Sequence, residues 1–310
     1  MVKRKWDVLG IGNAAIDELI YLDQFPLPDS KIQVREAQHQ GGGLVATALV
    51  AASRQGVQTA FCSLMGSDEL STFTLTELHK EEVDCSPCVL SEKGRPYHAW
   101  ILVDVANHTR TILYQPGNVE PPLEKITTSL ISSCQVLFID HHVPQAGLKA
   151  AKLARQLGIP VIADLENERL PRFNELLGYI DHLVIGLNFA RQITGKHELE
   201  DIFQMLDYKN RTACVLTAGD QGCWYSYQGG EILHYPAFKV KVNDTTGCGD
   251  VFHGVYAAAI ARRESVAQAV ELATAAAGLK AMHPGGRLGI PYHDQVKHFL
   301  REHHGLGNLE

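Results

Sequence analysis

The sequence lacks the features of a membrane or secreted protein. No run of about 18 apolar residues occurs in the 310-residue chain, so no segment is long enough to cross a bilayer as a helix. The basic start, residues 1–7, leads into only a short apolar run, which does not resemble the apolar core of a secretory signal. We therefore expect a cytoplasmic protein with no membrane partner.

A global positive charge is also missing. Lys and Arg number 28 against 35 Asp and Glu, and the resulting net charge of -7 excludes general nucleic-acid binding, because no positive field gathers phosphates. A small anionic ligand held by local groups remains compatible with this charge. The seven cysteines are odd in number and scattered, which indicates reduced thiols rather than a disulfide framework.

The composition is that of a globular protein, with 45% hydrophobic and 20% charged residues. Short apolar stretches alternate with helical patterns along much of the chain. Strands are predicted at 8–11, 59–64, 136–139, 161–163, 182–185 and 214–216, and helices at 44–55, 70–80, 145–157, 168–177, 251–262 and 266–281. This order predicts an α/β fold with a mostly parallel, helix-covered sheet.

Two regions interrupt this rhythm. Residues 97–104 and 109–114 alternate between apolar and polar side chains, which predicts a β-hairpin. Residues 31–38 alternate in the same way, and three glycines, 41–43, follow them, which predicts a turn before the helix at 44–55. We expect segments 13–43 and 95–118 to form a small sheet, or lid, beside the main sheet of a single domain that spans residues 1–310.

The run Asn-Asp-Thr-Thr-Gly-Cys-Gly-Asp at 243–250 carries the strongest chemical pattern. Gly247 and Gly249 precede a long helix, whose N-terminal N–H groups and partial positive charge attract anions. Glycines also let a phosphate approach the backbone. On this pattern alone Asp250 is either a helix cap or a base that accepts a proton from an attacking hydroxyl.

A competing pattern lies near the N-terminus. Gly10-Ile-Gly12-Asn-Ala-Ala15 follows a predicted strand and matches a dinucleotide-binding fingerprint, with Asp29 at about the expected distance of ~20 residues. Asp29 lies in a proline-flanked loop rather than at the end of a second strand. A nicotinamide-dependent oxidoreductase is therefore the weaker hypothesis.

Four motifs together resemble the ribokinase-like (PfkB) carbohydrate kinases, and the resemblance covers nearly the whole chain. The run 244–250 is similar to their C-terminal signature, D-T-x-G-A-G-D, with Cys248 in place of Ala. Residues 41–43 with the following Ala-rich helix, 217–222 and 283–291 are similar to the N-terminal signature, the nucleotide loop and the loop over a monovalent cation. The resemblance implies a three-layer α/β/α sandwich with a β-sheet lid, and transfer of a phosphoryl group from ATP, with Mg²⁺, to a small sugar.

The resemblance also implies roles for individual residues. Asp250 would be the catalytic base, and the N–H groups of Gly247, Cys248 and Gly249 would bind the transferring phosphoryl group. The implied substrate contacts are Asp17, Lys31, Gly42, Gly43 and His142, and the implied nucleotide contacts are Thr217, Gly219, Gly222, Lys239 and Thr274. Carbonyl groups of Asp244, Thr246, Lys280, His283 and Gly285 would bind K⁺.

Several positions depart from the family pattern. Gly186 and Phe189 stand where the family has the Asn and Glu that help to order Mg²⁺, which leaves Asp164 or Glu166 for that task. Ala46 replaces a sugar-binding Asn, which disfavours ribose, and Gly289 replaces a frequent Ser at the cation site.

Within the family, the chain looks most like the sulfofructose kinase branch. Lys31 occupies the place of one sulfonate-binding residue, whereas Tyr114 and His142 replace the other two. We therefore predict a neutral or anionic ketose-like substrate other than sulfofructose. A nucleoside kinase and a catalytically weak sugar- or nucleotide-binding regulator remain as alternatives, and the resemblance implies a homodimer formed through the lid.

Overall fold

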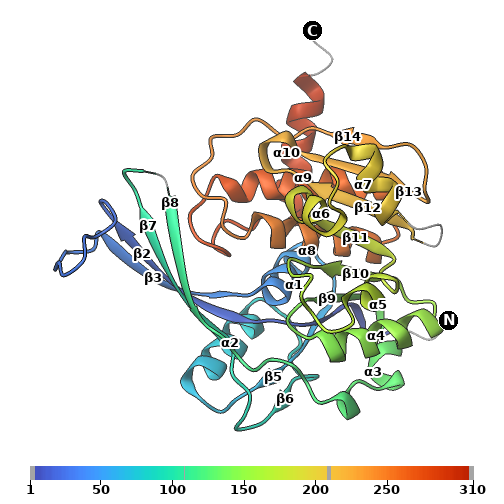
Figure 1. The fold of residues 1–310 in the computed structure, drawn as a ribbon, viewed down its shortest axis with the longest axis horizontal. Helices are drawn as coiled ribbons and strands as arrows, with labels where there is room; N and C mark the ends of the chain where they lie inside the picture. The colour runs from blue at the N-terminus through green and yellow to red at the C-terminus, as the bar shows by residue number, and fades with distance from the viewer. Residues whose placement is uncertain (1–3, 108, 208–210, 307–310) are drawn as a thin grey trace.

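The computed structural model describes residues 4–107, 109–207 and 211–306, and its centre is an eight-stranded sheet (Figure 1). The strand order is β14-β13-β12-β11-β10-β9-β1-β4, parallel from β4 to β12 and antiparallel at β13 and β14. The strands are β1 (Trp6–Ile11), β4 (Thr59–Cys62), β9 (Cys134–Asp140), β10 (Val161–Asp164), β11 (His182–Gly186), β12 (Ala213–Thr217), β13 (Cys223–Tyr227) and β14 (Leu233–Tyr235).

Helices cover both faces of this sheet, because alternate strand residues point to opposite sides. Val8 and Phe138 join one apolar cluster, while their neighbours Leu9 and Leu137 join the other. The first cluster contains α1 (Leu44–Arg54), α2 (Glu69–Lys80), α8 (Cys248–Ala261), α9 (Val266–Ala281) and α10 (His293–Leu306). The second contains α3 (Thr128–Ser132), α4 (Pro144–Gln156), α5 (Phe173–Leu177), α6 (Leu187–Thr194) and α7 (Leu199–Leu206).

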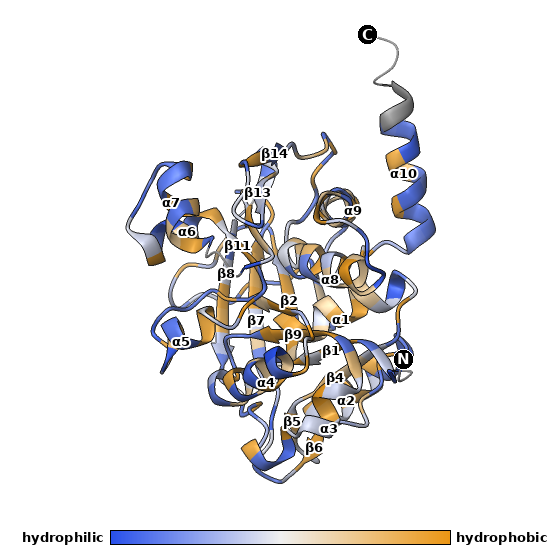
Figure 2. Ribbon diagram, turned by 90° about the vertical axis from the view of Figure 1, so that its right-hand side faces the viewer, coloured by the Kyte–Doolittle hydropathy of each residue, from blue (hydrophilic) through white to orange (hydrophobic). Residues whose placement is uncertain are grey.

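Hydropathy follows the same layering (Figure 2). The central strands are predominantly apolar, whereas α10 is largely hydrophilic and projects away from the other helices. Its base is held by Val296 and Leu300, which are buried against the first cluster. None of the helices in the described ranges combines the length and the apolar character that a bilayer crossing requires.

A separate four-stranded sheet, here called the lid sheet, extends to one side of the molecule (Figure 1). Its order is β3-β2-β7-β8, formed by β2 (Ala15–Leu22), β3 (Glu36–Gly42), β7 (Tyr97–Asp104) and β8 (Thr109–Gln115). β7 and β8 form the predicted hairpin, with Asp104 opposite Thr109. A short parallel pair, β5 (Leu64–Met65) and β6 (Val89–Leu90), lies near α2.

Three details of the predicted elements were wrong. The strand predicted at 31–38 begins only at Glu36, since β2 ends at Leu22 and Tyr21 pairs with Glu36, so residues 23–35 form a loop. The helix predicted at 168–177 is confined to α5, because Pro171 and the left-handed Arg172 (φ 62°) precede it. Gly41 and Gly42 lie in β3 rather than in a turn.

The dinucleotide-binding hypothesis also fails on topology. The segment after Gly12 enters β2 of the lid sheet instead of a helix, so no βαβ unit begins there. Gly10 and Gly12 instead allow close packing, since a Cβ at Gly10 would meet Val45 and Leu49. Asp29 lies in the exposed loop between β2 and β3.

Candidate active site

Carboxylates gather at the carboxyl edge of the parallel strands, where ligands of open α/β sheets bind. β9 ends at Asp140 and β10 at Asp164, both buried, and Glu166 follows two residues later. Asp17 comes from β2 of the lid sheet, and Asp250 from the first turn of α8. Topology thus brings together acids that are more than 200 residues apart in the sequence.

The predicted anion loop ends at the N-terminus of α8. Gly247 caps the helix with φ 75°, a conformation that favours glycine, and a Cβ there would lie 2.7 Å from Gly286 O. Gly249 is exposed, with open space where a Cβ would point. The N–H of Cys248 donates to Thr245 O at 3.2 Å, so this N–H group reaches a phosphate only in competition with that carbonyl.

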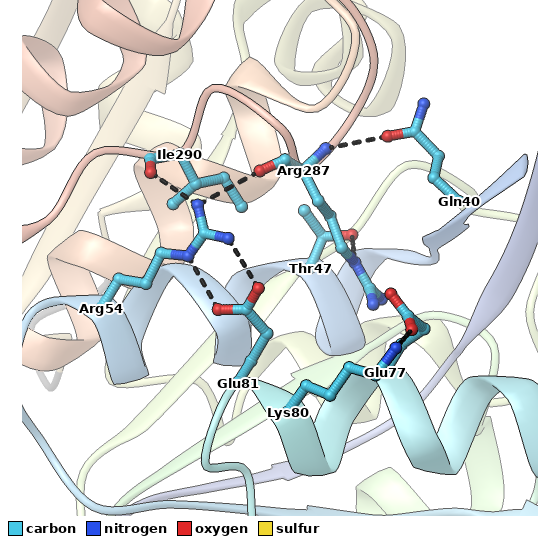
Figure 3. A network of polar contacts seen from close by, with 8 residues as sticks. All are labelled: Gln40, Thr47, Arg54, Glu77, Lys80, Glu81, Arg287 and Ile290. Carbon is cyan, nitrogen blue, oxygen red and sulfur yellow. Dashed lines mark hydrogen bonds and ion pairs between the residues drawn. The ribbon is translucent and has the colours of Figure 1, made fainter. Parts of the chain in front are cut away.

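Arg287 was not predicted as a site residue, yet its charge acts on both Asp17 and Asp250, and its side chain lies beside Thr47 of α1 (Figure 3). The side chain is 7% exposed and comes from the glycine-rich loop 283–290. It donates to Gly42 O at 2.7 Å and to Thr47 Oγ1 at 3.2 Å, while its Nη1 is buried without a hydrogen-bond partner. A Cβ at Gly41 would clash with that Nη1, which explains the glycine.

A second arginine fixes the backbone of the same loop (Figure 3). Arg54, at the end of α1, donates to Ile290 O at 2.7 Å and to Arg287 O at 3.4 Å, and it forms a two-pronged pair with Glu81. Gln40 of β3 accepts from the backbone N–H groups of Gly286 and Arg287. The lid sheet and α1 therefore hold loop 283–290 in place.

Burial and mutual repulsion disturb the acids of the site. The pKa of Asp250 is raised well above its usual range, first by burial and then by the charges of Asp164, Glu166 and Asp17, while Arg287 opposes the shift. Burial raises the pKa of Asp17 to about 6, and there too Arg287 acts in the opposite direction. Burial lowers the pKa of Arg287 to about 10, and the two aspartates oppose this change. Arg287 thus favours the ionised form of both carboxylates.

The expected substrate residues Asp17, Gly42 and Gly43 do come together. A Cβ atom at Gly42 would clash with the Asp17 carboxylate. A Cβ atom at Gly286 would lie 3.9 Å from Oδ2 of the same carboxylate. Gly43, with φ 90°, starts α1. Nearby, the Oδ1 atom of buried Asn13 has no hydrogen-bond partner.

His142 lies at the end of β9 in an aromatic group. Its ring is 4.6 Å from that of Tyr97 and 4.1 Å from that of His141, and Tyr114 stacks at 6.3 Å from Tyr97. Burial lowers the pKa of His142 to about 4, so the ring is neutral at pH 7. Its backbone N–H donates to Asp140 Oδ1, which fixes the start of this turn.

Lys31, by contrast, is not brought to this group. It is exposed in the loop 23–35 beyond the lid strands, and its predicted substrate role has no support from its position in this chain.

The predicted nucleotide residues divide into two sets. Thr217 ends β12, and Gly219 and Gly222 bound the turn that follows, with φ of 59° and 85°. Lys239 is exposed in the segment after β14. Thr274 is buried in α9, where its hydroxyl donates to Val270 O at 2.8 Å, so that hydroxyl is already engaged within the helix.

Two of the five carbonyls predicted to bind K⁺, those of Asp244 and His283, already have a cationic partner. Lys280 Nζ donates to Asp244 O at 3.0 Å and to His283 O at 3.4 Å. Asp244 uses its carboxylate to accept from the backbone N–H groups of Thr246 and Gly285, both at 2.8 Å. The residues present therefore do not fit a K⁺ ion at these carbonyls.

Comparison with known proteins identifies the family. The profile described as pfkB family carbohydrate kinase matches residues 7–292. The chain belongs to this family. As a pfkB carbohydrate kinase it transfers a phosphoryl group from ATP to a hydroxyl of its substrate.

Relatives of this pfkB kinase share its length. The ribokinase of Staphylococcus aureus (strain COL) is 23% identical, covering 93% of this chain and 98% of its own. The nucleoside kinase of Methanocaldococcus jannaschii is 25% identical, covering 94% and 96%. The structure of Arabidopsis thaliana ribokinase complexed with ribose and ATP superposes with a TM-score of 0.84 at 21% identity, covering 96% and 99%, which confirms the fold.

The acids of this pfkB kinase fit Mg²⁺ that is shared with phosphates. Burial raises the pKa of Glu166 to about 7, with Asp164 as the second cause, although solvent reaches Glu166 and attenuates both effects. Negative charge gathered in this way favours a divalent cation, although His253 lies 3.4 Å from the Asp164 carboxylate. Within the described residues no three His, Cys, Asp or Glu side chains form a metal site.

The family's missing magnesium motif has a structural counterpart. Gly186 precedes α6, and Phe189 is buried against Phe173, so neither position offers an oxygen ligand. Asn188 is exposed on the same helix. Asp164 and Glu166, together with Asp17 of the lid sheet, are the acids whose charges act on Asp250.

Proposed function

We propose that this kinase phosphorylates a small ketose-like sugar, neutral or anionic, with Asp250 as the catalytic base. The observation that carries the proposal is the position of Asp250. Asp250 lies in the first turn of α8, beside the glycine amides. Its carboxylate interacts electrostatically with Asp17 and Arg287. A carboxylate repels a phosphate, so its place at an anion site is best explained by a proton that it must accept.

In the proposed reaction, the sugar hydroxyl attacks the γ-phosphorus of ATP. Its proton passes to the Asp250 carboxylate, the new O–P bond forms, and the bond to the β-phosphate oxygen breaks to release ADP. The amides of Gly247 and Gly249 stabilise the negative charge on the phosphoryl oxygens. Mg²⁺ neutralises phosphate charge when bound, and Asp164 and Glu166 would hold it.

Unpartnered polar atoms support a polyhydroxyl substrate. Asn13 Oδ1 is a buried acceptor, whereas Gln40 Nε2 and Arg287 Nη1 are buried donors. Hydroxyl groups both donate and accept, so a sugar satisfies both kinds of atom at once. The fully buried Ala46 offers no amide to a ribose hydroxyl, which favours a sugar other than ribose.

A nucleoside is the second candidate acceptor. The ring group Tyr97, Tyr114 and His142 offers flat surfaces on which a base could stack, and Tyr114 is 65% exposed. The nucleoside kinase among the relatives is as similar in sequence as the ribokinases are. The aromatic group serves a ketose equally well through hydrogen bonds from His142.

An ATP-consumption screen over ketoses, aldoses, sugar acids and nucleosides tests the proposal. We expect the highest kcat/KM on a ketose or a keto sugar acid, with ADP formed in equal amount to phosphorylated product. Preference for nucleosides would select the second candidate. No turnover on any acceptor, with ATP still bound, would overturn the proposal in favour of a sugar- or nucleotide-binding regulator.

Assembly and location complete the proposed picture. β8 is exposed along its whole length, and Ile112 and Leu113 are 50% and 53% exposed, which supports a homodimer formed through the lid sheet. All seven cysteines are free, which suits the reducing cytoplasm. Light scattering should give the mass of a dimer, and Ile112→Lys with Leu113→Lys should give a monomer. A monomeric wild-type protein would exclude this dimer.

A further inference from the structure

Lys280 is the most deeply buried cationic side chain near the phosphate site. It lies in the last turn of α9 with 0% of its surface exposed. Carbonyl groups at a helix C-terminus lack helical partners and carry partial negative charge, which favours a cation there. A buried ammonium group nevertheless requires hydrogen-bond acceptors, because its desolvation is costly.

The acceptors of Lys280 belong to the two loops that border the phosphate site. Asp244 O, at 3.0 Å, starts the anion loop, and His283 O, at 3.4 Å, starts the loop that carries Arg287. Burial is the main cause that lowers the pKa of Lys280, and the nearby Asp244 opposes it. The ammonium group therefore joins the two loops through their backbone.

Further contacts of Asp244 strengthen the same junction. Its carboxylate accepts from Gly285 N across the loops and from Thr246 N within its own loop. Arg110 of the lid sheet contacts Thr246 Oγ1 at 3.0 Å and lies 3.9 Å from Asp244 Oδ1. The Asp244 backbone N–H also donates to Ala281 O, which secures the loop to the end of α9.

We propose that the ammonium group of Lys280 replaces the monovalent cation at these carbonyls, so that the kinase works without K⁺. An ammonium group and K⁺ carry the same charge, and ring-like sets of carbonyl oxygens hold either one. Because the ammonium group is covalently attached to the chain, it occupies the site at every salt concentration. No translational entropy of a free ion is lost when it binds. The inference rests on family membership and not on the identity of the sugar.

The tethered cation has a clear structural task. It holds the loop of Gly247 against the loop of Gly286, where the two backbones approach so closely that Gly247 tolerates no Cβ. This keeps the amides of the anion site beside Arg287. Loss of the ammonium group should loosen both loops and lower kcat more than it changes the KM of the acceptor.

The wild-type protein gives the first test, without any variant. Turnover and melting temperature are measured in KCl and in choline chloride at equal ionic strength. We expect both to be unchanged within error. Severalfold activation by K⁺, or a melting temperature that rises with K⁺, would overturn the proposal.

Two substitutions at Lys280 separate charge from space. Lys280→Ala leaves room for an ion, so we expect turnover roughly tenfold lower or more in choline chloride and a recovery in KCl or NH₄Cl. Lys280→Met fills the space without charge, so it should lose activity and show no recovery. Lys297→Met, on the exposed side of α10, is the matched control and should behave as wild type.

Thallium(I), which stands in for K⁺, supplies a readout besides activity. Anomalous diffraction should locate Tl⁺ at the carbonyls of Asp244 and His283 in Lys280→Ala crystals but not in the wild type. Tl⁺ at that position in the wild type, or full turnover of Lys280→Met, would overturn the proposal. The diffraction experiment requires no phosphoryl acceptor. It therefore tests the role of Lys280 even if the proposed sugar substrate is wrong.

Discussion

At the residue scale, the proposed base is a single carboxylate, and its neighbours set its charge. Asp250 is pressed toward the protonated form by burial and by three acids, and Arg287 acts against them. Arg287 favours the ionised form of Asp250, and a bound Mg²⁺ would act in the same direction, as the proposed phosphoryl transfer needs. The unusual surroundings of Asp250 thus belong to its function.

Replacement of the base should abolish most of the turnover. Asp250→Asn removes the proton acceptor but keeps the shape, so we expect kcat to fall by about 10²–10⁴-fold with ATP affinity nearly unchanged. Turnover assays and calorimetric titration with ATP measure the two effects. Asp294→Asn, on the exposed start of α10, is the control. Near-normal turnover of Asp250→Asn would remove the base role.

His142 should act on the acceptor and not on ATP. We expect His142→Ala to raise the KM of the acceptor far more than the KM of ATP, because its ring lies with Tyr97 at the end of β9. Initial-rate measurements with each substrate varied in turn test this. His197→Ala, at an exposed position before α7, is the control. An equal change in both KM values would exclude His142 from the acceptor site.

At the element scale, the packing of α1 on α8 positions both halves of the site. Gly43 immediately precedes α1, and Gly247 immediately precedes α8. The distance between these two helices therefore sets the distance between the proposed substrate site at Gly43 and the anion loop at Gly247. Gly254 of α8 lies against α1, where a Cβ would clash with Ala48 O. The close contact of the two helices depends on this residue.

A methyl group at this contact should destabilise the protein. We predict that Gly254→Ala costs about 1–3 kcal/mol, because overpacking forces the helices apart. Gly278→Ala in α9 is the matched control, since its Cβ would meet Phe238 at an ordinary 3.7 Å, and it should be neutral or slightly stabilising. Urea unfolding compares the two. Equal stability of both variants would contradict the packing argument.

At the scale of the whole molecule, the acid cluster costs stability in the free protein. Asp17 and Asp140 have pKa values raised to about 6, mainly by burial, and burial also raises the pKa of Asp250 well above its usual range. Such groups bind protons more tightly when folded. Their stabilising effect is therefore complete at low pH and is lost as the pH rises through the folded-state pKa values.

Histidines oppose this trend only at lower pH. Burial lowers the pKa values of His141, His142 and His182 to about 4, so these residues add stability as the pH rises to about 6.5. Above about pH 6.5 these histidines no longer change protonation. The carboxylates then determine how the free energy of unfolding changes with pH.

We predict that the melting temperature of the nucleotide-free wild type falls relative to that of Asp250→Asn as the pH rises from about 4 to about 8. Burial raises the pKa of Asp250 well above its usual range, and only the wild type must ionise this carboxyl group, where each unit of pKa elevation is worth about 1.4 kcal/mol, or about 2–4 °C in a chain of this size. Calorimetry over this pH range, with Asp294→Asn as control, measures the effect. Identical slopes for wild type and Asp250→Asn would contradict the assignment.

The sequence by itself determined the fold class, the lid hairpin and the catalytic signature, because these depend on local periodicity and on glycine and aspartate spacing. Through a family resemblance it also assigned Asp17, Gly42 and Gly43 to the substrate, and the structure places Asp17 beside Gly42. The sequence did not predict where β3 and α5 begin. Pairing with β2 decides the start of β3, and the left-handed Arg172 decides the start of α5.

Only the tertiary structure decided which charges meet. Arg287 gives no local signal of its role, because its partners Gly42 and Thr47 lie about 240 residues earlier in the chain. Lys280 was predicted for its carbonyl, whereas the structure shows that its ammonium group donates to Asp244 O and to His283 O. Long-range charge pairing and burial depend on how elements pack, and no local pattern in the sequence encodes that packing.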